Sequence, residues 1–137
     1  MRTMQRRPRA DRGAAALEFG LVALLLVTLL IGIIQFSFWF WAWQAAGHAA
    51  REASRVGAVT PCDTAKITST GTNDLNGTPT SVSPTVTVTK TSPVKVGDTI
   101  TVNVKFTAVN MGFFPGFSGV VDKSSTSRIE NVPAGGC

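Results

Sequence analysis

An uncharged stretch near the N-terminus constrains this chain more than any other feature. No Asp, Glu, Lys or Arg occurs from Phe19 to Ala50, and in residues 19–34 Thr28 is the single polar side chain. A helix rises about 1.5 Å per residue, so about 20 residues cross a hydrocarbon core of about 30 Å. The segment from Glu18 to Trp39 is roughly 31 Å long by this rise. The sequence therefore predicts a membrane-spanning helix.

The flanks of this helix predict its orientation. Five arginines and one aspartate lie in residues 1–13, although the whole chain has a net charge of +5. Such a basic flank is typical of the cytoplasmic side, and the aromatic run "FSFWFWAW" (36–43) suits the opposite interface. A nucleic-acid-binding protein would carry its basic patch on the folded domain, so nucleic acid is not an expected partner.

A cleaved secretory signal is the alternative interpretation of the same segment. The small residues of "AWQAAGHAA" (42–50) would suit a signal peptidase. However, the apolar region of a signal is about 7–15 residues long, and this one is longer and ends in bulky aromatics. The length favours a retained anchor.

The rest of the chain predicts an α+β fold. The Ala-rich run up to about residue 59 continues the helix outside the membrane, and Pro61 makes further continuation unfavourable. Apolar side chains alternate with polar ones in residues 85–89 and 98–106, as in half-buried strands, and residues 125–132 form a weaker final strand. One face of such an antiparallel sheet needs cover, which the outer half of the helix would provide.

The predicted organisation has three parts. Residues 1–13 form a basic cytoplasmic leader, residues 14–60 a long helix that spans the membrane in its first half, and residues 61–137 an extracytoplasmic β domain. Within residues 62–84 turn-forming residues dominate, and "AKITST" (65–70) fits either a short strand or a helical turn.

One motif resembles a known family. In "GAAALEF" (13–19) a glycine is followed by four residues, then by glutamate and an aromatic, as in the processing motif of type IV pilin-like proteins. Together with "AAREASRVGAV" (49–59), "VKVGDTITVNVKF" (94–106) and "STSRIEN" (125–131), it resembles the TadE-like proteins, which are minor pilins or pseudopilins of the tight-adherence (Flp) pilus system.

The resemblance implies a partner set and a cleavage site. A prepilin peptidase would cut after Gly13 on the cytoplasmic side and leave Ala14 as the new N-terminus, with Glu18 and Phe19 completing the motif. The other implied partners are pilin-like subunits and the pilus assembly platform.

Glu18 has two interpretations. A lone carboxylate at bilayer depth costs about 2.5–3.5 kcal/mol on insertion scales, and pairing with the amine of Ala14, in the same or a neighbouring subunit, would offset this cost. Alternatively, Glu18 lies at the interface, where the helix N-terminus favours a negative charge. The surrounding motif favours the assembly role.

The two cysteines are expected to pair. Cys62 and Cys137 lie outside the membrane in the predicted topology, where the compartment is oxidising. An internal bridge would stabilise the fold by roughly 4.5 kcal/mol in the chain-entropy model, and the alternative is an intermolecular bond. Two cysteines and one distant histidine lack the spacing of a metal site.

No catalytic set is apparent. The single histidine, His48, is expected to pair with Glu52 on the helix surface. One histidine in an Ala-rich helix supports no catalytic triad, so neither an enzyme nor a cofactor is expected.

Three phenylalanines in "NMGFFPGFSGV" (110–120) have two interpretations. Phe113, Phe114 and Phe117 could fold over the sheet as core, which is favoured because such residues are mostly buried. They could instead form an apolar tip that contacts a partner subunit or the membrane.

The predicted function is that of an assembly subunit of a pilus. The alternative is a single-pass cell-surface protein with an extracellular ligand-binding β domain, which would not be processed by a prepilin peptidase.

Overall fold

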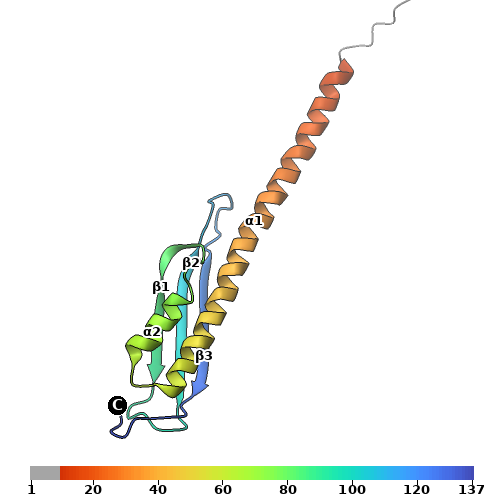
Figure 1. Ribbon diagram of the computed structural model, residues 1–137. Coiled ribbons are helices and arrows are strands. Elements are labelled where there is room, and N and C mark those ends of the chain that lie inside the picture. Colours follow the sequence, from red (N-terminus) through yellow and green to blue (C-terminus); the bar gives the residue numbers. More distant parts are fainter. Residues whose placement is uncertain (1–9) are drawn as a thin grey trace, which may run out of the picture. The chain divides into compact units, whose positions relative to one another are not determined.

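The computed structural model describes residues 10–137, and over these residues it contains two helices and three strands (Figure 1). They are α1 (Ala10–Val59), α2 (Thr64–Asn73), β1 (Thr80–Lys90), β2 (Thr99–Ala108) and β3 (Val120–Arg128). The strands form one antiparallel sheet in the order β1-β2-β3. The predicted α+β fold is confirmed. The arginines of the predicted leader at positions 2, 6, 7 and 9 lie outside the described residues.

Helix α1 is continuous and ends where the sequence predicts. Its last turn is closed by a hydrogen bond from the backbone N–H of Thr60 to the carbonyl of Val56 (2.9 Å), after which Pro61 has no N–H to continue the ladder. The structure divides into two compact units, of which the first ends at Ile34 and the second begins at Gln35. The second unit thus contains the outer part of α1 and the whole sheet.

Strand β2 forms the centre of the sheet and carries its core. Along β2 the apolar side chains are buried and the polar ones between them are more exposed, as the alternation predicts. The buried residues are Ile100, Val102, Val104, Phe106 and Ala108. The opposite face is polar: Thr101 shares a hydrogen bond with Thr126 (2.9 Å) and Asn103 donates to Asp122 (2.6 Å). The sheet therefore needs cover on one face.

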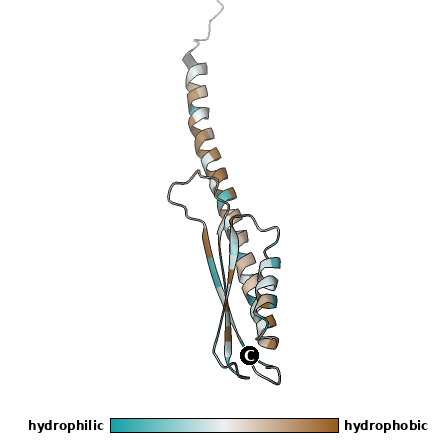
Figure 2. Cartoon of the chain, turned by 90° about the vertical axis from the view of Figure 1, so that its left-hand side faces the viewer, coloured by the Kyte–Doolittle hydropathy of each residue, from teal (hydrophilic) through white to brown (hydrophobic). Residues whose placement is uncertain are grey.

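Alanines of α1 cover this face, as predicted. Ala42, Ala46, Ala49, Ala50 and Ala53 are almost completely buried and pack in clusters with the apolar residues of β2. Their spacing of three and four residues places them on one side of the helix. Figure 2 shows the two helices on the same side of the sheet. Small side chains here allow the helix backbone to approach the sheet closely.

Helix α2 resolves the ambiguity in residues 65–70. Asp63 caps it by accepting a hydrogen bond from the backbone N–H of Lys66 (2.9 Å). Ile67 is fully buried in the core, and an added Cβ at Gly71 would lie 3.2 Å from a methyl group of Val86. Helix α2 is therefore stabilised by its N-terminal cap and by packing against β1.

The predicted last strand was misplaced. Residues 125–132 were expected to pair, but β3 spans Val120–Arg128. Ile129 still exchanges backbone hydrogen bonds with Gly97 and Asp98, just before β2 (2.8 Å each). The chain turns away at Glu130, whose backbone N–H donates to the carbonyl of Ala58 at the end of α1 (2.8 Å). Val121 and Ile129 are the two fully buried apolar side chains near the ends of β3, and the Ser/Thr-rich centre lies between them.

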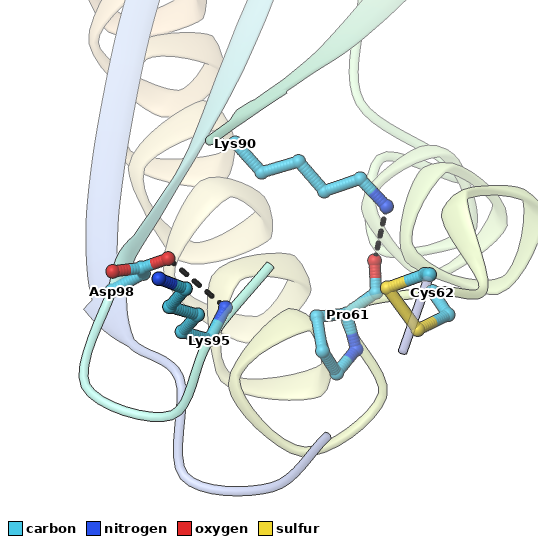
Figure 3. Close-up of a disulfide and its surroundings, with 6 residues drawn as sticks. Pro61, Cys62, Lys90, Lys95 and Asp98 are labelled. Atoms are coloured by element: carbon cyan, nitrogen blue, oxygen red, sulfur yellow. Dashed lines mark hydrogen bonds between the residues drawn. A yellow bond between two sulfur atoms is a disulfide. The ribbon is translucent and has the colours of Figure 1, made fainter. Parts of the chain in front are cut away.

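A disulfide joins Cys62 to Cys137, the internal pairing that the sequence predicts (Figure 3). The two residues are separated by 75 positions. Beside the bridge, Lys90 donates a hydrogen bond to the carbonyl of Pro61, and the nearby β1–β2 turn is closed by the backbone N–H of Lys95 and the carboxylate of Asp98 (3.0 Å). The bridge thus connects the C-terminus to the end of α1.

The disulfide leads to a mass and a stability prediction. Under non-reducing conditions, the purified protein should be a monomer two hydrogens lighter than its reduced form. Cys137→Ser should lower the free energy of unfolding by up to about 4.5 kcal/mol, because it releases a long loop in the unfolded chain. Mass spectrometry and denaturant unfolding measure the two effects. Free thiols, or a covalent dimer from native membranes, would contradict the internal bridge.

Candidate functional site

The inner part of α1 has the length and hydropathy of a membrane span. The helix from Gly13 to Val59 contains a window of 18 residues with a mean hydropathy of 2.7, and none of that window is buried within the protein. Large apolar side chains are exposed around the helix, among them Leu17, Leu21, Leu24, Leu25 and Leu29. Apolar residues exposed on all sides of a helix need lipid or other helices as their surroundings. One N-terminal apolar helix is compatible with a single-pass membrane protein.

The residues of the processing motif lie on this exposed helix. Gly13, Ala14 and Glu18 are exposed, and the side chain of Phe19 is 74% exposed. A Cβ added at Gly13 would meet no atom within 4 Å. Within the single folded chain, these residues are therefore not held by packing against other described residues. They are accessible to another protein.

Aromatic rings form a ladder along the next turns of α1. Consecutive ring pairs among Phe36, Trp39, Phe40 and Trp43 have centroid distances of 6.0–6.5 Å. The Nζ of Lys123 on β3 lies 3.5 Å from the centroid of the Trp43 ring, a cation–π contact. The predicted aromatic belt thus ends where a cation from the sheet meets the helix.

Gln35 links α1 to the connection between β2 and β3. Its side-chain amide donates to the carbonyl of Val109 (2.9 Å), and its amide oxygen accepts from the backbone N–H of Met111 (2.9 Å). Gln35 is only 3% exposed. Sequence reasoning missed this residue. The available signal was a glutamine that directly follows the apolar run ending at Ile34.

The core interpretation of the three phenylalanines is wrong. Phe113 is 51% exposed, and Phe114 and Phe117 are only partly buried. The rings of Phe113 and Phe114 contact each other edge to face, with centroids 5.7 Å apart. The sheet face is already covered by α1 and α2, so these rings remain at the surface as an apolar tip.

His48 also has a different partner from the predicted one. Its Nδ1 lies 3.7 Å from a carboxylate oxygen of Asp74, just after α2, while Glu52 lies 3.9 Å from Arg55. Among the described residues, no group of three or more His, Cys, Asp or Glu side chains is arranged to hold a metal ion. The contacts of His48 are those of a surface residue.

Comparison with known proteins gives a family match over most of helix α1. Residues 13–55 match the family model described as TadE-like protein, which covers the motif, the apolar run and the Ala-rich outer part of α1. Searches of curated proteins and of solved structures gave no match. The match over residues 13–55 agrees with the resemblance to TadE-like proteins that the sequence predicts.

Proposed function

We propose that this protein is a minor pilin or pseudopilin that serves as a structural subunit in the assembly of a tight-adherence (Flp) type IV pilus. The TadE-like family connects the chain to that pilus system as a pilin-like component. The single observation that carries the proposal is the apolar helix that follows the "GAAALEF" motif, no part of whose most apolar window is buried within the protein. Such a helix fits the membrane before assembly and the helices of other subunits after it.

The proposed orientation places the N-terminus inside and the sheet outside. The arginine-rich leader favours the cytoplasmic side, and the internal disulfide suits an oxidising compartment. In this orientation the Gly13–Ala14 bond lies at the cytoplasmic face, where a prepilin peptidase would cut it. The β domain faces neighbouring subunits or the assembly platform.

Sequencing the N-terminus of the protein from membranes of its own host tests the proposal. We expect the mature chain to begin at Ala14. A chain that still begins at Met1 would favour an unprocessed single-pass surface protein with a ligand-binding β domain. A start between residues 47 and 51 would indicate a secreted domain released by signal peptidase, and the pilin proposal would be rejected.

A further inference from the structure

The connection between β2 and β3 is unusually apolar for an exposed loop. No Asp, Glu, Lys or Arg occurs from Phe106 to Val121. Within this stretch Met111, Phe113 and Val120 are 44–51% exposed. Exposed apolar clusters of this kind mark a surface that contacts lipid or protein. We call residues 109–119 the β2–β3 loop, and Figure 1 shows it at the end of the sheet beside α1.

Gln35 fixes the position of the β2–β3 loop along α1. It bonds both to the carbonyl of Val109 and to the backbone N–H of Met111, each at 2.9 Å. In the sequence Gln35 directly follows the apolar run, and Trp39, where a span of about 31 Å from Glu18 would end, lies four residues later. The loop is therefore held at the helix position where the hydrocarbon core is expected to end.

Several polar groups of the β2–β3 loop are hydrogen-bonded within the protein. Asn110 donates to the carbonyl of Phe117 (2.8 Å) and accepts from the backbone N–H of Gly112 (2.8 Å). The backbone N–H of Val109 donates to the carbonyl of Pro79 (3.1 Å). Irregular backbone is costly in a membrane because its polar groups lose water, and these bonds reduce that cost.

Charges begin directly beyond the loop. Lys123 stacks on Trp43, and the neighbouring Lys105 lies 3.8 Å from Asp122. Gln35 and Trp43 are separated by about 12 Å along the helix axis, from the rise per residue. The start of β1 is also uncharged, since no charged residue occurs between Asp74 and Lys90. A zone free of charged side chains thus precedes a zone of lysines, the order of polarity found across a membrane interface.

We infer that the β2–β3 loop is a second membrane contact, with the side chains of Met111 and Phe113 inserted at the boundary between headgroups and acyl chains of the outer leaflet. Interfacial anchors bury their apolar groups about 5–10 Å deep, which this zone accommodates. Gln35 sets the depth, and the Trp43–Lys123 pair marks the headgroup level. The occupant is lipid, because Gln35, which holds the loop, lies within the uncharged run of residues 19–50, and the loop itself carries no charge. The inference rests on the proposed anchoring of α1, and not on cleavage or pilus assembly.

Such a contact would orient the β domain before assembly. With α1 alone as an anchor, the outer domain would be free to tilt and rotate at the membrane. A second contact restricts the tilt of the sheet relative to the membrane plane. Leaving the membrane would then require the loop to be withdrawn together with the helix.

The depth of Phe113 in a bilayer tests the inference. The full-length protein is placed at one copy per nanodisc of phosphatidylethanolamine and phosphatidylglycerol. A nitroxide is attached through a genetically encoded keto amino acid at position 113, which leaves the disulfide intact. Collision with oxygen, which partitions into lipid, is compared with collision with a water-soluble nickel chelate. We expect oxygen to exceed nickel at position 113.

Val96 is the matched control. It is apolar and 65% exposed, in the turn between β1 and β2 at the other end of the sheet. Nickel should exceed oxygen there, so the ratio of the two accessibilities reverses between the positions. Equal nickel accessibility at 113 and 96 would place the loop in water and overturn the inference. Exclusion of both reagents at 113 would mean cover by protein, and would also overturn it.

Gln35→Leu separates the positioning role from general stability. It keeps the helix apolar but removes both hydrogen bonds to the loop. We expect the label at 113 to become more mobile and to lose at least part of its excess oxygen accessibility, while the label at 96 stays unchanged. Because the unprocessed chain serves in these measurements, failure of cleavage would leave this result intact. An unchanged label at 113 would reject Gln35 as the residue that sets the depth.

Discussion

Gly13→Leu is expected to stop processing and leave the full-length precursor in the membrane. In the structure α1 runs through the Gly13–Ala14 bond. A peptidase needs the backbone of this bond unwound and accessible. Glycine destabilises a helix by about 1 kcal/mol relative to alanine, so it eases local unwinding, whereas leucine stabilises the helix and adds a branched side chain at the bond. Immunoblotting of membranes for precursor and mature forms measures the effect.

Gly20→Leu is the matched control for this experiment. A Cβ added at either Gly13 or Gly20 meets no atom within 4 Å, so within the single chain both positions have open space for a side chain. Both replace a glycine by leucine on the exposed, apolar part of α1. Only the first lies at the proposed cleavage site. Normal amounts of mature protein from Gly13→Leu, or equal blockage by Gly20→Leu, would contradict the proposed role of Gly13.

The helix α1 and the strand β2 could be predicted because α1 contains a long uncharged apolar run and β2 alternates apolar with polar residues. In β2, Ile100, Val102 and Val104 alternate with polar residues, and one face of the strand is buried. In α1 the uncharged run of residues 19–50 indicates the membrane-spanning part, and Pro61, two residues after Val59, indicates where the helix ends. Both patterns involve residues close together in the chain, so they can be recognised in a single sequence.

Helix α2 and strand β3 lack such patterns. Residues 64–73, "TAKITSTGTN", contain Ile67 as their one large apolar residue, and this helix depends on its Asp63 cap and on contacts with β1. The centre of β3 is a run of serine and threonine whose place is decided by pairing with β2. The positions of α2 and β3 are determined by tertiary contacts, and the secondary-structure propensities of their residues do not reveal such contacts.

The Gln35 contact could not be predicted for the same reason. It joins residues 74 and 76 positions apart in the sequence. The general burial of apolar residues favours a core position for the phenylalanines of the β2–β3 loop, but two helices already occupy the buried face of the sheet. The sequence shows that the loop contains apolar residues. That Phe113 is exposed depends on the tertiary structure and could not be predicted.

Glu18→Gln is expected to assemble poorly into pili while insertion and cleavage continue. Glutamine keeps the shape of the side chain and removes its charge. The variant should insert at least as well, because a neutral amide costs less to bury than a carboxylate. It should still be cut, because the proposed processing depends chiefly on Gly13. Glu18 therefore matters after cleavage in this proposal.

The physical reason lies in the amine that cleavage creates. Among residues 13–137 of the single chain, Glu18 takes part in no salt bridge. Removal of the leader would give Ala14 a positive amine, four residues before Glu18 on the same helix face, or within reach of Glu18 in a neighbouring subunit. Without the carboxylate, this ammonium would remain unpaired at the membrane boundary or between packed helices, where an isolated charge is costly.

Glu52→Gln is the matched control. It makes the same change on the outer part of α1, where Glu52 lies 3.9 Å from the exposed Arg55. Exposed pairs of this kind contribute little, so piliation should stay normal. Counting surface pili beside blots for the mature form tests both variants. Normal piliation with Glu18→Gln would show that Glu18 merely marks the membrane interface, because an essential ion pair cannot survive the loss of its single carboxylate.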